Sequence, residues 1–231
     1  MKINWKSVRA ITRINFKKTT WIAYLVAGLC FLNSFFQALI CYLINYSENT
    51  PVSEGNMLLL VLILAAVLIP AVNFRKIMHL NGKKADFFVG TLLNYIIFSA
   101  VISVLNLILL YTFDKAMSSV LTIWNISDIF GWTGDGIIIA FLRQFAFYML
   151  LGVTIHTLTA IQTFWWGWVT DLIIIAIISV FTPIAPLRKV LLDFFNIIIF
   201  NGNTAEHIVV CLALSAAIYS LNIPILSRKK I

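Results

Sequence analysis

The segment NFRKIMHLNGKKADFF, residues 73–88, separates two long apolar runs of the chain. Because both runs have membrane length, the segment predicts a short, partly amphipathic link between two transmembrane helices. Its basic character places the link on the cytoplasmic side of a membrane. Its charged side chains are four bases and one acid: Arg75, Lys76, Lys83, Lys84 and Asp86.

The amino-acid composition excludes a soluble globular protein. Of the 231 residues, 61% are hydrophobic and 11% are charged, and the mean hydropathy is +0.96. Soluble domains carry about 25% charged residues. So many apolar side chains cannot be buried in one small core, which makes lipid the solvent. We therefore expect an all-α integral membrane protein, with residues 1–231 forming a single transmembrane domain.

The apolar runs predict six transmembrane helices. One further apolar stretch, residues 184–200, is too interrupted to cross the membrane. We expect it on the extracellular side, between the fifth and sixth helices, either as a re-entrant hairpin or as an amphipathic surface helix. The six helices are expected at about residues 20–44, 56–72, 88–113, 137–163, 165–182 and 207–226.

Residues 1–18 predict a basic amphipathic helix before the first transmembrane helix. Five bases recur every three or four residues, which places them on one face of a helix. Apolar side chains occupy the other side, so the helix is expected to lie in the membrane interface. A solvated positive tail is the alternative. The five bases are Lys2, Lys6, Arg9, Arg13 and Lys17.

The distribution of charge predicts that both termini are cytoplasmic. Of the 17 lysines and arginines, 13 lie in residues 1–18, in the link and in the C-terminal tail at 227–230. Seven of the nine acidic residues fall in the loops expected on the other side. The positive-inside rule then fixes the orientation. Topology accounts for the net charge of +8, so we infer no nucleic-acid partner.

The sequence lacks the motifs of nucleotide-binding and catalytic proteins. No GxxxxGK[ST] loop, HExxH metal motif or GxSxG elbow occurs. Cys30, Cys41 and Cys211 lie in apolar runs without CxxC spacing, so we expect buried thiols and no metal site. A bridge between Cys41 and Cys211 has no support in this pattern. We expect no enzyme, and no cofactor bound by this chain.

Four polar residues inside the predicted transmembrane helices are candidates for a translocation path: Asn33, Gln37, Arg143 and His156. Ionisable side chains at membrane depth usually face a bundle interior or a wet cavity. Each candidate also has a structural interpretation. Arg143 would snorkel to the interface or pair with Asp135, and His156 would form hydrogen bonds between helices. Asn33 and Gln37, one turn apart, would face the interior or a second subunit.

The layout resembles that of a type-2 ABC transporter permease. The shared features are an interfacial basic helix, six spans with both ends inside, a basic link after the second span and a broken hairpin after the fifth. Within the link, NGKKADFFVG, residues 81–90, is similar to the family's glycine, Ser-Arg-Lys-like cluster and paired phenylalanines. Lys83 stands where serine is usual, and the glycine is displaced by one position.

The resemblance implies a permease subunit in the plasma membrane of a bacterium, paired with a second copy or a paralogue. A separate ABC ATPase subunit would bind ATP and Mg and drive export of an amphipathic or hydrophobic substrate, such as a peptide, an antibiotic or a lipid. The link would be the cytoplasmic coupling helix that docks on this ATPase. Its docking residues would be Phe74, Arg75, Lys76, His79, Asn81, Gly82, Lys83, Lys84 and Asp86.

Two other classes of protein fit the same pattern. A six-span substrate-capture subunit for vitamin uptake has a comparable size, but it requires neither the N-terminal helix nor the basic link. A non-transport membrane protein, such as an immunity or scaffold protein, is the second class. The lysines of the link also have a simpler interpretation, in which they only enforce topology or attract the anionic membrane surface.

Overall fold

The computed structural model describes residues 3–44, 52–118 and 122–229, except for the side chains of residues 37, 38, 41, 42 and 44. Within these ranges every named element of secondary structure is a helix. One isolated β-bridge joins Val52 to Trp124. The elements are α1 (Trp5–Ile44), α2 (Glu54–Met57), α3 (Leu59–Leu68), the π-helix η1 (Ile69–Asn73), α4 (Phe74–His79), α5 (Lys84–Leu109), the π-helix η2 (Leu110–Asp114), α6 (Lys115–Met117), α7 (Ile126–Ile129), α8 (Ile137–Ile161), α9 (Trp165–Phe181), α10 (Ala185–Ile198), α11 (Thr204–Ser220) and α12 (Asn222–Arg228).

The described helices suit a membrane protein. Five are long and apolar enough to cross a bilayer, and the bent pair α9–α10 is a sixth candidate. The expected all-α class is therefore confirmed, with five to six candidate spans. The five are Trp5–Phe36, Glu54–His79, Lys84–Met117, Ile137–Ile161 and Thr204–Arg228.

The core lies where α3, α5 and α8 meet. Small residues on α3, Ala65 and Ala66, are fully buried there, and Gly152 of α8 lets Leu62 approach closely. A Cβ at Gly152 would lie 3.1 Å from the Leu62 side chain. Such small residues allow helices to pack at short range in a membrane. Larger buried side chains fill the rest: Ile69, Tyr95, Phe98, Ile102, Tyr148, Met149 and Val153.

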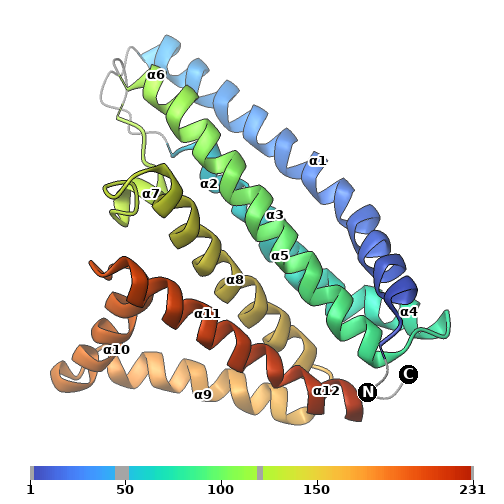
Figure 1. The fold of residues 1–231 in the computed structure, drawn as a ribbon. Coiled ribbons are helices and arrows are strands. Elements are labelled where there is room, and N and C mark those ends of the chain that lie inside the picture. Colours follow the sequence, from blue (N-terminus) through green and yellow to red (C-terminus); the bar gives the residue numbers. More distant parts are fainter. Residues whose placement is uncertain (1–2, 45–51, 119–121, 230–231) are drawn as a thin grey trace.

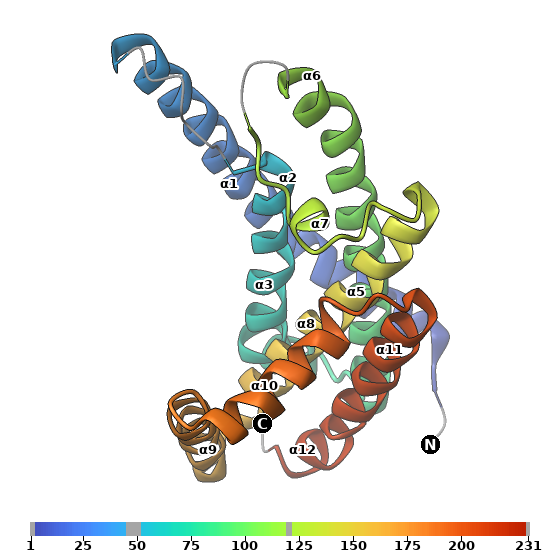
Figure 2. The same ribbon diagram turned by 90° about the vertical axis from the view of Figure 1, so that its left-hand side faces the viewer.

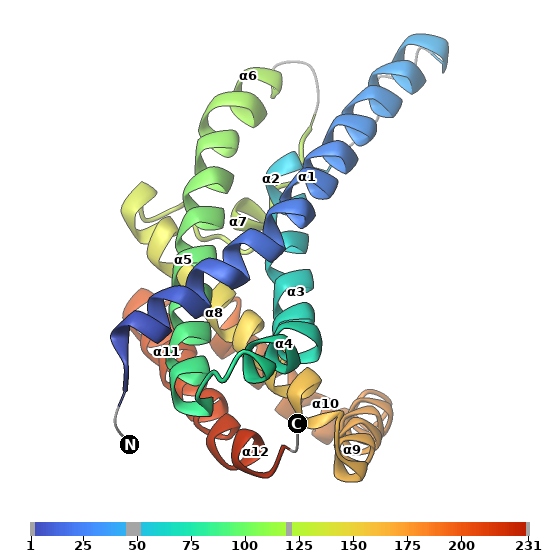
Figure 3. The same cartoon turned by 90° about the vertical axis from the view of Figure 1, so that its right-hand side faces the viewer.

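Helix α1 packs along α5 in its first half, bonds to α2 through Asn33 and Ser34, and extends away from the other helices at its end (Figures 1 to 3). Its exposed apolar side chains include Tyr24, Phe31 and Leu43. Helix α8 lies against α3, α5 and α11. The described ends of the chain, near residues 3 and 229, lie at the same end of the bundle as α4 and α12 (Figure 3).

The structure contains no separate N-terminal helix. A single helix, α1, covers Trp5–Ile44, so the predicted boundary between an interfacial helix at 1–18 and a span from about residue 20 is wrong. No glycine or proline interrupts this region, and the hydroxyls of Thr19 and Thr20 bond back to the carbonyls of Asn15 and Phe16. These bonds satisfy the polar side chains within the helix, which therefore continues without a break.

The basic link is not an independent helix. Helices α3, η1 and α4 follow one another without a loop, and Glu54–His79 is one continuous candidate span. Pro70 has no N–H and lies in the π-helical turn, where the Phe74 N–H bonds to the Ile69 carbonyl five residues earlier. The helix thus passes the proline, and the true connection is a short turn over residues 80–83.

The region predicted as a fifth span and a separate extracellular stretch forms a bent helix pair. Helix α9 has 17 residues, which gives about 26 Å, and the hydrocarbon core is about 30 Å thick. Pro183 follows its end, and α10 continues at an angle of 117°. Together, α9 and α10 carry the chain from the end of α8 to the start of α11. The break predicted at residues 182–183 therefore matches the boundary between α9 and α10, and the two helices together form a broken span or a re-entrant loop.

Candidate functional site

The residues predicted to dock a partner lie at one end of the bundle, which we call the basic end. It comprises the start of α1, the turn between α4 and α5, and α12 with Lys229. The described bases that gather there come from segments far apart in the sequence. The best candidate for a functional surface is the turn at residues 80–83, because it projects between two long helices.

The turn between α4 and α5 is a glycine-dependent helix cap. Asn81 has a left-handed backbone, with φ of 60°, and its N–H donates to the Met78 carbonyl at 3.0 Å. The Gly82 N–H donates to the Ile77 carbonyl at 3.0 Å. These two bonds form a Schellman motif, in which asparagine tolerates the left-handed position. Asn81 and Gly82 therefore shape the turn, which is a role that sequence reasoning had assigned to docking.

The Gly82→Ala substitution is expected to destabilise the turn by about 1 kcal/mol. A Cβ at this position would lie 2.6 Å from Ile77 Cγ2 and 2.7 Å from the Ile77 carbonyl oxygen. The measurement is the apparent melting temperature of the purified protein in detergent. Gly28→Ala is the matched control, because a Cβ there meets no atom within 4 Å. Equal melting temperatures for the two variants would contradict this cap.

The predicted docking residues divide into an exposed set and a buried set. Phe74 and Asp86 are almost fully buried, and Gly82 and Lys84 are half-buried. Only the exposed residues can contact a partner without rearrangement of the fold. They are Arg75, Lys76, His79, Asn81 and Lys83.

The buried and half-buried residues fix the turn to α1 and to the C-terminal segment. The carboxylate of Asp86 accepts a bond from the Asn4 N–H at 3.0 Å. Lys84 Nζ donates to the carbonyls of Ser227 and Lys229 at 3.0 and 2.8 Å. In return, Lys229 Nζ donates to the Pro70 carbonyl at 3.1 Å. The turn is therefore attached to the first and last described helices of the chain.

Three buried asparagines extend this attachment into the bundle. Asn73 Nδ2 donates to Asn15 Oδ1 at 3.0 Å, and Asn15 Nδ2 donates to Asn94 Oδ1 at 2.9 Å. Asn94 Nδ2 then donates to the Thr12 carbonyl at 3.2 Å. We call this the asparagine relay. Sequence reasoning missed it, although asparagines within long apolar runs are a signal for hydrogen bonds between helices.

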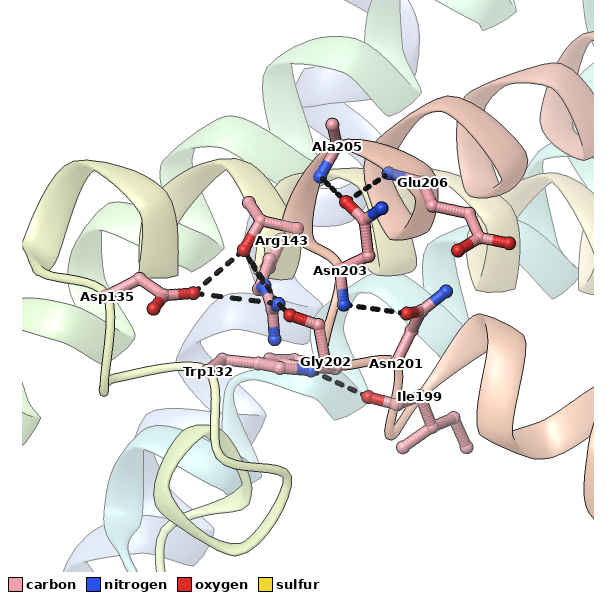
Figure 4. A network of polar contacts seen from close by, with 10 residues as sticks. Trp132, Asp135, Arg143, Ile199, Asn201, Gly202, Asn203, Ala205 and Glu206 are labelled. Atoms are coloured by element: carbon pink, nitrogen blue, oxygen red, sulfur yellow. Dashed lines mark hydrogen bonds and ion pairs between the residues drawn. The ribbon is translucent and has the colours of Figure 1, made fainter.

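Arg143 has a structural role at the opposite end of the bundle (Figure 4). Its side chain is 3% exposed and lies 3.6 Å from the carboxylate of Asp135. Its Nη2 donates to Thr204 Oγ1 at 2.7 Å and to the Gly202 carbonyl at 3.4 Å. Thr204 Oγ1 in turn donates to Asp135 at 2.8 Å. This arrangement matches the predicted pair with Asp135 and ties the start of α8 to the start of α11.

His156 also has a structural interpretation. It is buried between α5 and α11, and its Nδ1 lies 2.7 Å from the Tyr95 hydroxyl. Its ring also packs against Tyr219, at 5.8 Å between centroids. These contacts match the predicted hydrogen bond between helices.

The other two path candidates lie on α1. The amide of Asn33 donates to Glu54 Oε1 at 2.9 Å, which joins α1 to α2, while the side chain of Gln37 lies outside the described part. Asn33 thus binds Glu54 of α2, while Arg143 and His156 both lie on α8 but bond to different partners. The structure does not bring them together into one path.

The sequence also predicts that the chain has no metal site and that its three thiols are buried. Within the described residues, no group of three or more His, Cys, Asp or Glu side chains is placed to hold a metal ion. Cys30 and Cys211 are free, and the side chain of Cys41 lies outside the described part. No protein-family model, curated protein or solved structure matches this chain. Function must therefore be inferred from the residues and their geometry.

Proposed function

We propose that this chain is the permease subunit of an ATP-driven exporter in a bacterial plasma membrane, with both termini cytoplasmic. A separate ATPase subunit, which would bind ATP and Mg, docks on the basic end. A second copy or a paralogue completes the transporter. The proposed cargo is amphipathic or hydrophobic, such as a peptide, an antibiotic or a lipid, because the described helices expose many large apolar side chains.

The observation that carries this proposal is the contrast between the tip and the base of the turn. At the tip, Lys76 and Lys83 are exposed and suit an acidic protein surface. At the base, Lys84 and Asp86 are held by α12 and α1. A surface that only enforced topology would not require such a rigid attachment.

The same contacts suggest how movement at the docking site reaches the membrane helices. Helix α4 continues directly into α3 through η1, and α5 begins at Lys84, immediately after the turn. A displacement of the turn would therefore move α3 and α5 together. Through Asp86 and Lys84 it would also move the start of α1 and the end of α12. Packed helices of this kind transmit small shifts as rigid elements.

The Lys76→Glu/Lys83→Glu variant is expected to lose binding of the ATPase by about tenfold. Both side chains are exposed, so the fold is retained while the charge facing the partner is reversed. The measurement is the amount of ATP-binding protein, identified by mass spectrometry, that co-purifies with the tagged full-length chain from its native membranes. Lys84 is unsuitable for this test, because its ammonium group supports the C-terminal segment.

Lys115→Glu is the matched control, because Lys115 is an exposed lysine at the opposite end. It should retain the ATPase at the level of the unmodified chain. Co-purification that is equal in all three proteins would refute docking at the turn. The absence of any ATP-binding protein from all three would instead favour a substrate-capture or immunity protein.

A further inference from the structure

A cationic recess lies at the basic end, beside the exposed tip of the turn. It has a volume of about 300 Å³ and is lined by Arg75 of α4, Thr163 and Phe164 after α8, Arg228 of α12, and Lys229. Three of the five lining residues are basic. The bases come from two segments that are far apart in the sequence, α4 and the end of α12, so the fold itself assembles this concentration of charge.

Among the described residues, the positive charge in the recess has no acidic partner. No acidic side chain of the described residues lies within salt-bridge distance of Arg75, Arg228 or Lys229. Lys229 is 5% exposed, and its Nζ lies 4.7 Å from the centre of the Phe74 ring. Burial, together with the charge of Arg75, lowers the pKa of Lys229 to about 8. A bound anion would relieve this repulsion, which makes the recess suited to a phosphate group.

The surroundings of the recess indicate a phospholipid as the source of that phosphate. Phe164 stacks on Trp166 at 5.2 Å between centroids, and Trp165 and Trp168 are exposed next to it. Tryptophans of this kind mark the level of lipid headgroups. From there, α9 presents a continuous apolar surface that includes exposed Leu172, along which acyl chains can lie. A free anion would make no use of this surface.

We propose that the recess formed by Arg75, Arg228 and Lys229 is a binding site for the headgroup of an anionic phospholipid, with its acyl chains along α9. Basic recesses between helices at the cytoplasmic surface recognise anionic headgroups. The lipid would hold α12 and the α8–α9 connection against α4. The site is separate from the exposed tip at Lys76 and Lys83, so its failure and the failure of ATPase docking can be told apart.

Native mass spectrometry of the delipidated, full-length protein in detergent tests this proposal. The probes are phosphatidylglycerol, phosphatidylcholine and glycerol 1-phosphate. We expect phosphatidylglycerol to bind, and the Arg228→Gln variant to bind it about tenfold more weakly, because one charged hydrogen-bond donor is lost. Arg228 is exposed and makes no side-chain hydrogen bond within the described residues, so the fold does not depend on it.

Two controls sharpen the test. Arg228→Lys retains the charge and should retain most of the binding, and Arg188→Gln removes an exposed arginine from α10 and should change nothing. Equal binding of phosphatidylcholine, or unchanged binding by Arg228→Gln, would overturn the site. Displacement of phosphatidylglycerol by glycerol 1-phosphate at similar concentration would overturn the assignment to a lipid.

Discussion

Replacing Asn94 with leucine is expected to destabilise the protein by about 2 kcal/mol, since a buried polar group left without a partner costs about 1–3 kcal/mol. The change removes the acceptor of the Asn15 amide and the donor to the Thr12 carbonyl. Both Asn15 and Asn94 are fully buried, so water cannot replace the lost bonds. For a chain of this size, the melting temperature should fall by about 4–8 °C.

Two comparison variants separate the asparagine relay from a general effect of mutation on α5. Val101→Leu changes a side chain on the same helix that is 48% exposed, and it should leave the melting temperature unchanged. The triple variant Asn15→Leu/Asn73→Leu/Asn94→Leu removes all three amides together, and it should recover part of the loss because no side-chain amide of the relay is then left unpaired. An Asn94→Leu protein with the same melting temperature as the unmodified chain would contradict a stabilising role for the asparagine relay.

The second large effect is expected for Arg143→Met. The change removes the bonds that Arg143 makes to Thr204 and Gly202, and it leaves Asp135 without its cation. Loss of charged hydrogen bonds at a buried site should destabilise the protein by about 2 kcal/mol. The segment at residues 199–204 should also be cleaved faster in limited proteolysis, because the arginine ties it to α8.

Arg143→Lys should rescue little of this loss. The guanidinium reaches Thr204 Oγ1 through both Nε and Nη2, and a lysine ammonium cannot reproduce this pair of bonds. Lys115→Met removes an exposed base at the same end and should leave both the melting temperature and the cleavage rate unchanged. If Arg143→Met were cleaved at residues 199–204 at the same rate as the unmodified chain, the arginine would not hold this segment.

The fold class could be predicted from the sequence because it depends on composition and on the length of apolar runs. Breaks in helices were less predictable, since they depend on how local bonds are satisfied. Thr19 and Thr20 bond within α1, so a polar sequence did not end that helix. Pro70 is accommodated by a π-helical turn, so the second span continues into residues that were expected to form a separate link.

The segment predicted to dock a partner forms a turn at one end of the bundle, but its exposed and its buried residues could not be told apart from the sequence. The exposure of Lys83 and the burial of Asp86 depend on contacts with Asn4 and with residues 227–229. Such long-range partners leave no periodic signal in a single sequence. The same holds for Arg143, whose partner Asp135 was expected but whose bonds to Thr204 and Gly202 were not.

Site-specific photo-crosslinking from position 83 tests ATPase docking most directly. A photoreactive residue placed at the exposed Lys83 of the full-length chain is activated in its native cells, and the same residue at Ile138, which is 73% exposed at the opposite end, is the control. Docking at the turn predicts a crosslinked ATP-binding protein from position 83 and none from position 138. Crosslinks from position 83 to lipid alone, with no ATP-binding protein, would contradict it.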